Sequence, residues 1–136
     1  MVHSSSLIAK TIEKGGKFAF EDLEVWKNAI IFANKIIDLI DLMNTDRKHY
    51  RLLEQLESSS ASIAMNIAEG KGRYSKKEFI QYLYISRGSL NETITLLILF
   101  GKREWISESQ LNQLKEDGVV IGKQLSSLIQ AIKQSL

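Results

Sequence analysis

The sequence predicts an all-α protein, an antiparallel up-down four-helix bundle, and three observations support this fold class. Apolar residues recur at helical spacing through most of the 136-residue chain. Proline, which breaks helices more strongly than any other residue, is absent. Short polar segments separate four periodic stretches, and short connections make successive helices antiparallel neighbours. We therefore expect a bundle over residues 19–136, preceded by a loose N-terminal arm over residues 1–18.

The arm is mostly polar and ends near the pair Gly15-Gly16. Leu7, Ile8 and Ile12 could form a short helix, although a loose terminus is the commoner state of such segments. Residues 1–6 lack the charged start and the following apolar stretch of a secretory signal, so we expect none.

The first two bundle helices are expected over residues 22–43 and 47–69, joined by a turn at residues 44–46. The first helix carries two apolar stripes, which are Trp26, Ala29, Ile30, Ala33, Ile37 and Ile40, and Val25, Phe32, Ile36, Leu39 and Met43. One face of the second helix carries Leu52, Leu53, Leu56, Ser60, Ile63 and Ile67. Gly70 follows this helix and is expected to be its left-handed C-terminal cap.

The third helix has a strong start signal. Ser75 and Glu78 are spaced as a capping box. Tyr74 and Phe79 occupy the positions of a hydrophobic staple around that box. Tyr74 could instead stack on a nucleic-acid base, although the staple role suits it better. The apolar pattern then predicts a helix that reaches about Phe100.

The fourth helix begins with the same device. Ser107 and Gln110 form its capping box, and Ile106 and Leu111 occupy the staple positions. Its apolar seam then follows a heptad, with Leu111, Leu114, Gly118, Ile121, Leu125, Leu128 and Ile132.

The segment 94–100 of the third helix is apolar nearly all round, because only Thr95 is suited to face water. A helix that is apolar all round is buried all round, whereas every helix of a lone four-helix bundle has a solvent-facing side. We therefore expect a homo-oligomer, and a local apolar excess in a monomer is the alternative. The expected oligomer interface contains Ile94, Leu96, Ile98, Leu99, Phe32 and Leu39.

Composition excludes several classes of protein. Without cysteine, neither a disulfide framework nor a thiolate metal site can form. No apolar stretch reaches the roughly 18–20 residues that span a bilayer, so we expect a cytoplasmic protein that does not act in a membrane. The net charge of +2, from 18 basic and 16 acidic residues, is too balanced to indicate nucleic acid by itself. Any basic footprint must therefore be local.

Candidate catalytic groups are few, and we expect no enzyme, no cofactor and no metal. His3 and His49 lack partners at a matching spacing. Glu54 and Glu57 could hold a metal, but without histidines a solvated helix face is the commoner arrangement. The serines at positions 58, 59, 60 and 62 lack a candidate base. They are expected instead to let two helices approach closely.

A polar cluster is expected inside the bundle. Asn66 and Glu69 could meet Arg87 and Asn91, which lie four apart on one face of the third helix. A carboxylate drawn into a bundle needs a cation, because desolvating it alone is costly. The main interpretation is a structural polar lock, with Glu69 paired to Arg87 and Asn66 bonded to backbone near Gly70. A ligand-binding role is the alternative.

Basic residues gather at both ends of the expected bundle. Up-down topology brings Arg47, Lys48, Arg51, Lys102 and Arg103 to one end. The opposite end carries Lys71, Arg73, Lys76 and Lys77, with Lys14 and Lys17 near it. Either group could bind a phosphate backbone, especially if subunits multiply it. The alternative for each is a solvated end balanced by nearby carboxylates.

Three segments of the chain together resemble a known family. The first is residues 20–29 (FEDLEVWKNA). The second contains Gln55-Leu56, Ser62-Ile63, residues 66–70 (NIAEG) and Gly72-Arg73. The third contains residues 75–79 (SKKEF), Tyr82-Leu83 and residues 87–92 (RGSLNE). They span about residues 20–100 and resemble bacterial four-helix-bundle proteins first noticed in intervening sequences of 23S rRNA genes.

The resemblance implies a ring-like homopentamer. It also implies a relation to the accessory variability determinants of diversity-generating retroelements, which bind nucleic acid and a reverse transcriptase through a basic surface. The chain departs from the family where basic residues usually follow Gln-Leu, since Glu57 and Ser58 stand there. Ala64 stands where the family usually has proline, which should leave the second helix straighter.

The leading hypothesis is a non-enzymatic pentameric bundle that binds RNA or DNA, with a possible protein partner such as a reverse transcriptase. The alternative is an assembly or interaction scaffold with no nucleic-acid role. A metal or small-ligand site near Glu54 or Glu69 is the third hypothesis.

Overall fold

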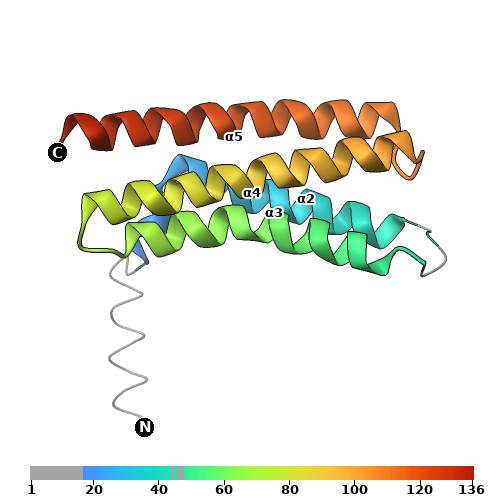
Figure 1. Ribbon diagram of the computed structural model, residues 1–136, viewed down its shortest axis with the longest axis horizontal. Helices are drawn as coiled ribbons and strands as arrows, with labels where there is room; N and C mark the ends of the chain where they lie inside the picture. Colours follow the sequence, from blue (N-terminus) through green and yellow to red (C-terminus); the bar gives the residue numbers. More distant parts are fainter. Residues whose placement is uncertain (1–16, 44, 46–47) are drawn as a thin grey trace, which may run out of the picture.

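The computed structural model describes residues 17–43, 45 and 48–136. A one-turn 3-10 helix, η1 (Ala19–Asp22), precedes four long helices, which are α2 (Glu24–Leu42), α3 (Tyr50–Lys71), α4 (Lys76–Lys102) and α5 (Glu108–Gln134). The four helices run alternately in opposite directions along the long axis (Figure 1). The predicted all-α up-down four-helix bundle is confirmed. Residues 1–16 of the predicted arm and Arg47 of the predicted basic end lie outside the described residues.

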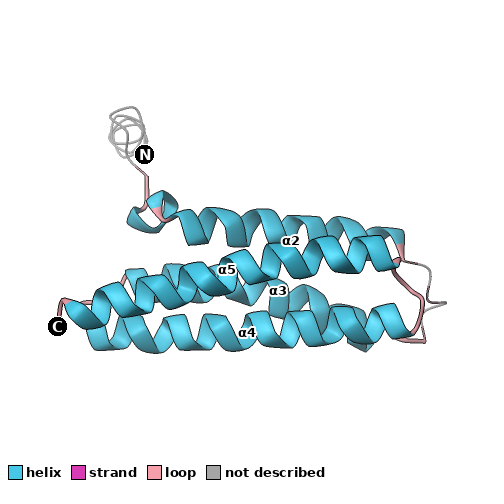
Figure 2. Ribbon diagram, turned by 90° about the horizontal axis from the view of Figure 1, so that it is seen from above, coloured by secondary structure: helices cyan, strands magenta, loops and turns pink. Residues whose placement is uncertain are grey.

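Each end of the bundle is formed by a fixed set of chain segments. The α3–α4 connection, the start of α2 and the end of α5 meet at one end, on the left of Figure 1. The α2–α3 and α4–α5 connections meet at the other end. Seen from above in Figure 2, the helices keep this lengthwise arrangement. The topology therefore groups the basic residues as predicted, with 71–77 at one end and 48–51 and 102–103 at the other.

The helix starts follow the capping residues where the sequence contains them. Ser75 Oγ accepts a hydrogen bond from the Glu78 backbone N–H at 3.3 Å. At the start of α5, Ser107 and Gln110 form a complete capping box, with bonds of 2.8 and 3.0 Å. The first helix begins two residues later than predicted, because residues 19–22 form η1 instead. Capping chemistry is local, and therefore these starts can be read directly from sequence.

The prediction that Gly70 is a left-handed C-terminal cap is wrong. Helix α3 continues through Lys71, and Gly70 is buried inside it. The C-cap is Gly72, whose φ of −79° and ψ of −3° are right-handed. Gly70 is instead a point of close packing, because a Cβ built on it would lie 2.6 Å from Tyr82 Cβ and 2.9 Å from Phe79 Cδ1. Contacts this short leave no room for a side chain.

The hydrophobic staple predicted between Tyr74 and Phe79 is also wrong. The Tyr74 side chain is 108% exposed and packs on nothing in the core. Phe79 is half-buried and packs against the core, beside Gly70. The exposed Tyr74 side chain therefore contributes nothing to packing in the core.

Small polar side chains line the interface between α3 and α4. Ser59 and Thr93 are buried and their hydroxyl oxygens lie 2.8 Å apart. Ser86 Oγ donates to the Ile63 carbonyl oxygen at 2.8 Å, and Ser62 and Ser89 are joined by another 2.8 Å bond. Among the described residues, no buried side-chain polar atom lacks a partner. Small hydroxyl side chains thus let α3 and α4 approach closely, as the serine-rich stretch predicted.

The Ser59–Thr93 bond can be tested by replacing Thr93 with valine. Valine keeps the shape but removes the hydroxyl, so Ser59 keeps only its 3.2 Å bond to the Leu56 carbonyl. We expect the free energy of unfolding to fall by about 1–2 kcal/mol in urea denaturation. Combining Thr93→Val with Ser59→Ala should cost less than the sum of the single changes, by about 0.5–1 kcal/mol.

Thr95 provides the matched control for this test. Its hydroxyl donates to the Asn91 carbonyl at 2.8 Å, as Thr93 does to Ser89, but Thr95 is exposed. Thr95→Val should change the unfolding free energy by no more than about 0.5 kcal/mol. Equal effects at 93 and 95 would show that the interhelical bond contributes nothing.

Three of the six predicted oligomer-interface residues are core residues of the single chain. Phe32, Leu39 and Leu96 are only 1%, 8% and 6% exposed. Their assignment to a contact with another chain is therefore wrong, because packing within the bundle already covers them. Ile94 is half-buried, with its Cδ1 2.8 Å from the position of a Cβ on Gly118. Ile98 and Leu99 remain 37% and 42% exposed.

Candidate nucleic-acid interface

Four cations surround the α3–α4 connection. Lys71 is the last residue of α3, Arg73 lies in the connection, and Lys76 and Lys77 open α4. All four side chains are exposed. We call this group, together with Tyr74, the α3–α4 basic end. The chain places it there because Gly72 and Ser75 end one helix and start the next within four residues.

Neighbouring groups hold three of these cations in place without cancelling their charge. Arg73 Nη2 donates to the Tyr82 hydroxyl at 2.6 Å, and its Cζ lies 4.8 Å from that ring centroid. Lys71 Nζ lies 5.8 Å from the Phe79 ring, and Lys76 Nζ donates to the Ser135 carbonyl at 3.0 Å. Aromatic faces and carbonyls orient a cation while leaving its positive charge intact. These basic side chains are thus partly held in position before any ligand binds.

A single ion pair involves this group among the described residues. Arg73 Nη2 lies 3.7 Å from Glu69 Oε1, and both side chains are well exposed. Exposed pairs of this length contribute little and are screened by salt. Lys76 and Lys77 also lie in the first turn of α4, where the positive end of the helix dipole repels them. A bound anion would relieve that repulsion.

Tyr74 projects from the middle of this group. It follows Arg73 directly and precedes Lys76 by two residues, with its side chain fully exposed. Exposed aromatic side chains among cations are the usual platform on which bases of single-stranded nucleic acid stack. Of the two roles that its sequence position indicated, a hydrophobic staple and base stacking, the exposure of Tyr74 excludes the staple.

The positive surface extends to a cluster that the sequence did not reveal. The Arg87 Cζ lies 4.8 Å from the Tyr84 ring centroid, and Lys133 Nζ lies 5.5 Å from it. A hydrogen bond with Lys133 is the main cause that lowers the pKa of Tyr84 below its ordinary value. Lys133 comes from the last turn of α5, which runs antiparallel to α4 and therefore returns beside its first half. Only the predicted up-down topology could have indicated from the sequence that Lys133 lies beside the first half of α4.

The predicted polar lock does not form, and its assignment is wrong. Asn66 Nδ2 donates to the carbonyl and the hydroxyl of Ser62, both at 2.8 Å. Glu69 pairs with Arg73, whereas Arg87 lies on Tyr84. Asn91 is exposed. Asn66 and Arg87 are half-buried while Glu69 and Asn91 are exposed, and no hydrogen bond or ion pair joins the four side chains. The row of hydroxyls between α3 and α4 takes the expected structural role.

Like the α3–α4 basic end, where Glu69 and Glu78 are exposed, the other end of the bundle carries both cations and carboxylates. Lys48, Arg51, Lys102 and Arg103 are exposed there, as predicted. Arg103 Cζ lies 5.6 Å from the Trp105 ring, which also packs on His49 at 4.8 Å. The carboxylates of Asp41, Glu104 and Glu108 are exposed on the segments that form this end. The positive charge is therefore mixed with negative charge.

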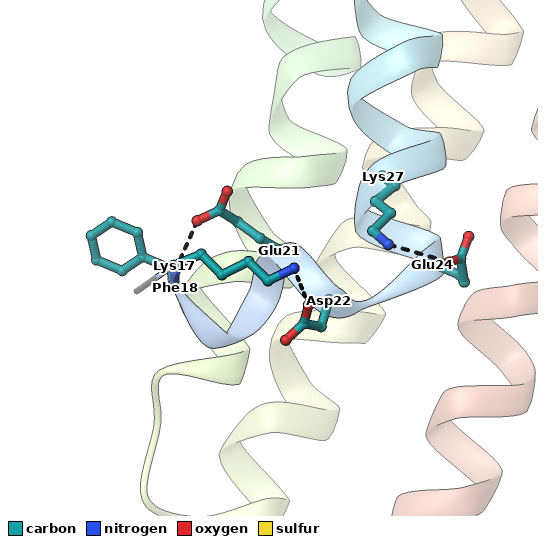
Figure 3. A network of polar contacts seen from close by, with 6 residues as sticks. All are labelled: Lys17, Phe18, Glu21, Asp22, Glu24 and Lys27. Atoms are coloured by element: carbon teal, nitrogen blue, oxygen red, sulfur yellow. Dashed lines mark hydrogen bonds and ion pairs between the residues drawn. The ribbon is translucent and has the colours of Figure 1, made fainter. Parts of the chain in front are cut away.

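Lys17, which the sequence placed near the α3–α4 basic end, is already paired. Its Nζ lies 2.7 Å from Asp22 Oδ1 (Figure 3). The hydrogen bond with Asp22 raises the pKa of Lys17, and the same bond lowers the pKa of Asp22. Figure 3 also shows Lys27 beside Glu24, at 3.4 Å. The start of the described chain thus adds no free positive charge to this end.

Neither a metal centre nor a membrane span is found in the part of the chain that the structure describes. No three histidine, aspartate or glutamate side chains there are grouped so that they could hold a metal ion. Glu54 and Glu57 are both exposed on α3. None of the described helices is long and apolar enough to cross a bilayer.

Comparison with known proteins gives two matches. Residues 21–127 match a family described as 23S rRNA-intervening sequence protein. The chain is also similar to a crystal structure from Bacteroides thetaiotaomicron VPI-5482, of a protein with unknown function from the S23 ribosomal protein family. The identity is 30% and the TM-score 0.72, over 77% of this chain and 97% of that chain. No curated protein matches at a significant level.

Proposed function

Since the chain belongs to the family of 23S rRNA-intervening sequence proteins, we propose that it is a non-enzymatic, homo-oligomeric bundle that binds RNA or DNA through the α3–α4 basic end. One observation carries this proposal, the fully exposed Tyr74 set among four exposed cations. Lysine and arginine would contact phosphates, and Tyr74 would stack on an unpaired base. The preferred ligand is therefore a single-stranded loop or end rather than a continuous duplex.

Assembly would strengthen such binding. The exposed pair Ile98 and Leu99 on α4, with the 56% exposed Val119 on α5, leaves apolar surface that a second copy would cover. The resemblance noted above implies five copies in a ring. Several basic ends in one particle would bind one nucleic acid with an avidity well above that of a single end.

The test is the salt dependence of binding to labelled single-stranded RNA and DNA, measured by fluorescence anisotropy. Lys76→Glu with Lys77→Glu should weaken binding roughly 10- to 30-fold near 100 mM salt and lower the slope of log K against log salt by about 1.4. Tyr74→Ala should weaken binding about 5- to 100-fold and leave that slope nearly unchanged. The two variants thus separate phosphate contacts from base stacking.

Lys115→Glu with Lys123→Glu is the matched control, because both lysines are exposed on α5 and the change in net charge is the same. This variant should bind within about twofold of the natural sequence if the contact is local. An equal loss in both double variants would mean that only net charge matters. No binding at low salt would favour the alternative, an assembly or interaction scaffold without a nucleic-acid role.

A further inference from the structure

Helices α2 and α3 leave an apolar groove open on the surface. Its volume is about 450 Å³, and its lining residues are Phe20, Trp26, Ile30, Ala33, Asn34, Ile37, Ala61, Ala64, Met65 and Ala68. Of these, only Asn34 is polar. Ile30 is 43% exposed and Met65 is 67% exposed at its rim. Alanines form much of the lining, so the groove is shallow, smooth and suited to larger apolar side chains from outside.

The described chain begins at one end of this groove. The ring of Phe18 is stacked on Phe20 at 5.5 Å, and Phe20 lies 5.1 Å from Trp26. Phe20 and Trp26 both line the groove. Figure 3 shows Phe18 at the start of η1. The first described residues therefore lie beside the end of the groove that Phe20 and Trp26 line.

We propose that residues 7–12 of the same chain dock in the α2–α3 groove. As a helix, this segment would have Ile8 and Ile12 on one face, because they are four positions apart, with Leu7 beside Ile8 at the edge of that face. Gly15-Gly16 can adopt the backbone angles needed to turn the chain back along α2. A returning helix rises about 1.5 Å per residue, as α2 does. In this arrangement Ile12 would lie nearer the Phe20 end of the groove, and Ile8 would lie farther along it, toward Ile30.

The length of the arm matches the groove. Trp26 and Ile37 are eleven positions apart in α2, about 17 Å along its axis, and residues 4–14 as a helix would cover a similar distance. The tether also favours this occupant over a second copy, because a short linker supplies an effective concentration in the millimolar range. The family match begins only at residue 21, so the arm lies outside the shared region. The α3–α4 basic end plays no part in this inference.

The absence of cysteine makes the groove directly testable with engineered thiols. Met65→Cys places a single thiol at the rim, and Ser126→Cys places one on the exposed surface of α5. Each is combined with Ile8→Gln and Ile12→Gln in the full chain. The rate of reaction with a thiol reagent should rise at least about tenfold at position 65 and stay unchanged at position 126.

Lys10→Gln with Glu13→Gln is the control, because it puts the same new residue type on the opposite face of the arm. It should leave the rate at position 65 unchanged. Circular dichroism should show a folded helical bundle in all variants, since the cysteines replace exposed residues of α3 and α5 and the other changes lie in the arm. If the thiol at position 65 reacts at the same rate with and without the changes at Ile8 and Ile12, the proposal is overturned.

A disulfide test identifies which copy supplies the arm. Ile8→Cys with Met65→Cys should oxidise to a product that migrates as a single chain on a non-reducing gel, at every protein concentration. A cross-link only between chains, or none at all, would overturn docking within one chain. Neither result depends on nucleic-acid binding, so the outcome is separate from that of the proposed function.

Discussion

Replacing Gly70 by alanine is expected to lower the free energy of unfolding by about 2 kcal/mol. The new Cβ would lie 2.6 Å from Tyr82 Cβ, an atom fixed to the α4 backbone that cannot rotate away. Relief therefore requires α3 and α4 to move apart at the end where they are joined. Overpacking of this kind costs about 1–3 kcal/mol or more, partly offset by the better helix propensity of alanine. Thermal unfolding should show a midpoint roughly 8 °C lower.

Gly88→Ala is the control with the opposite expected sign. Gly88 lies within α4 and is exposed, and no atom comes within 4 Å of a Cβ built on it. Only the propensity gain remains, so stability should rise by about 0.5–1 kcal/mol. Because both variants replace a helical glycine by alanine, the difference between their unfolding free energies measures the cost of close packing apart from the gain in helix propensity. A stable Gly70→Ala variant would mean that the helices do not approach so closely.

Placing two carboxylates on the exposed apolar surface of α4 should convert an oligomer into monomers. Ile98→Asp with Leu99→Asp would bury two charges per copy at the proposed interface, and unpaired buried charges cost several kcal/mol each. We expect the self-association constant to fall more than about 1,000-fold. Light scattering should change from a multiple of the 15.5 kDa chain mass to that mass itself.

Ile31→Asp with Leu42→Asp is the control, because both residues are exposed apolar residues of α2, at 54% and 79%. The control adds the same charge and should keep the assembled mass. If the natural sequence is monomeric at tens of micromolar, the proposed assembly is wrong. In that case Ile98 and Leu99 are a local apolar excess, the alternative considered from sequence.

Most features that depend on a few neighbouring residues were predicted well, and the Tyr74–Phe79 staple is the exception. The four helices follow from apolar periodicity, and the Ser107 box from a local capping pattern. The cations of the α3–α4 basic end lie within seven residues of one another, so their grouping needed no tertiary information. Lys133 joins them only through the return of α5, which leaves no local pattern.

The errors came from features that depend on how two helices are rotated and how closely they pack. A glycine near a helix end is compatible with a cap or with close packing, and only the position of Tyr82 decides for Gly70. The apolar residues of segment 94–100 look alike in sequence. Leu96 turns into the core of its own chain while Leu99 stays exposed, and a small difference in helix rotation separates the two. Glu69 found a closer cation one turn away than Arg87 across the interface.

The hydroxyl row between α3 and α4 has a consequence for the order in which the molecule folds. The two helices are consecutive, and a four-residue connection joins them, so bringing them together closes a very small loop. Short-range contacts of this kind form rapidly. We expect the α3–α4 hairpin to form early, with α2 and α5 docking on it afterwards. The contacts of Lys71 and Arg73 beside Tyr74 would then form early, and the bond from Lys76 to Ser135 would form only when α5 docks.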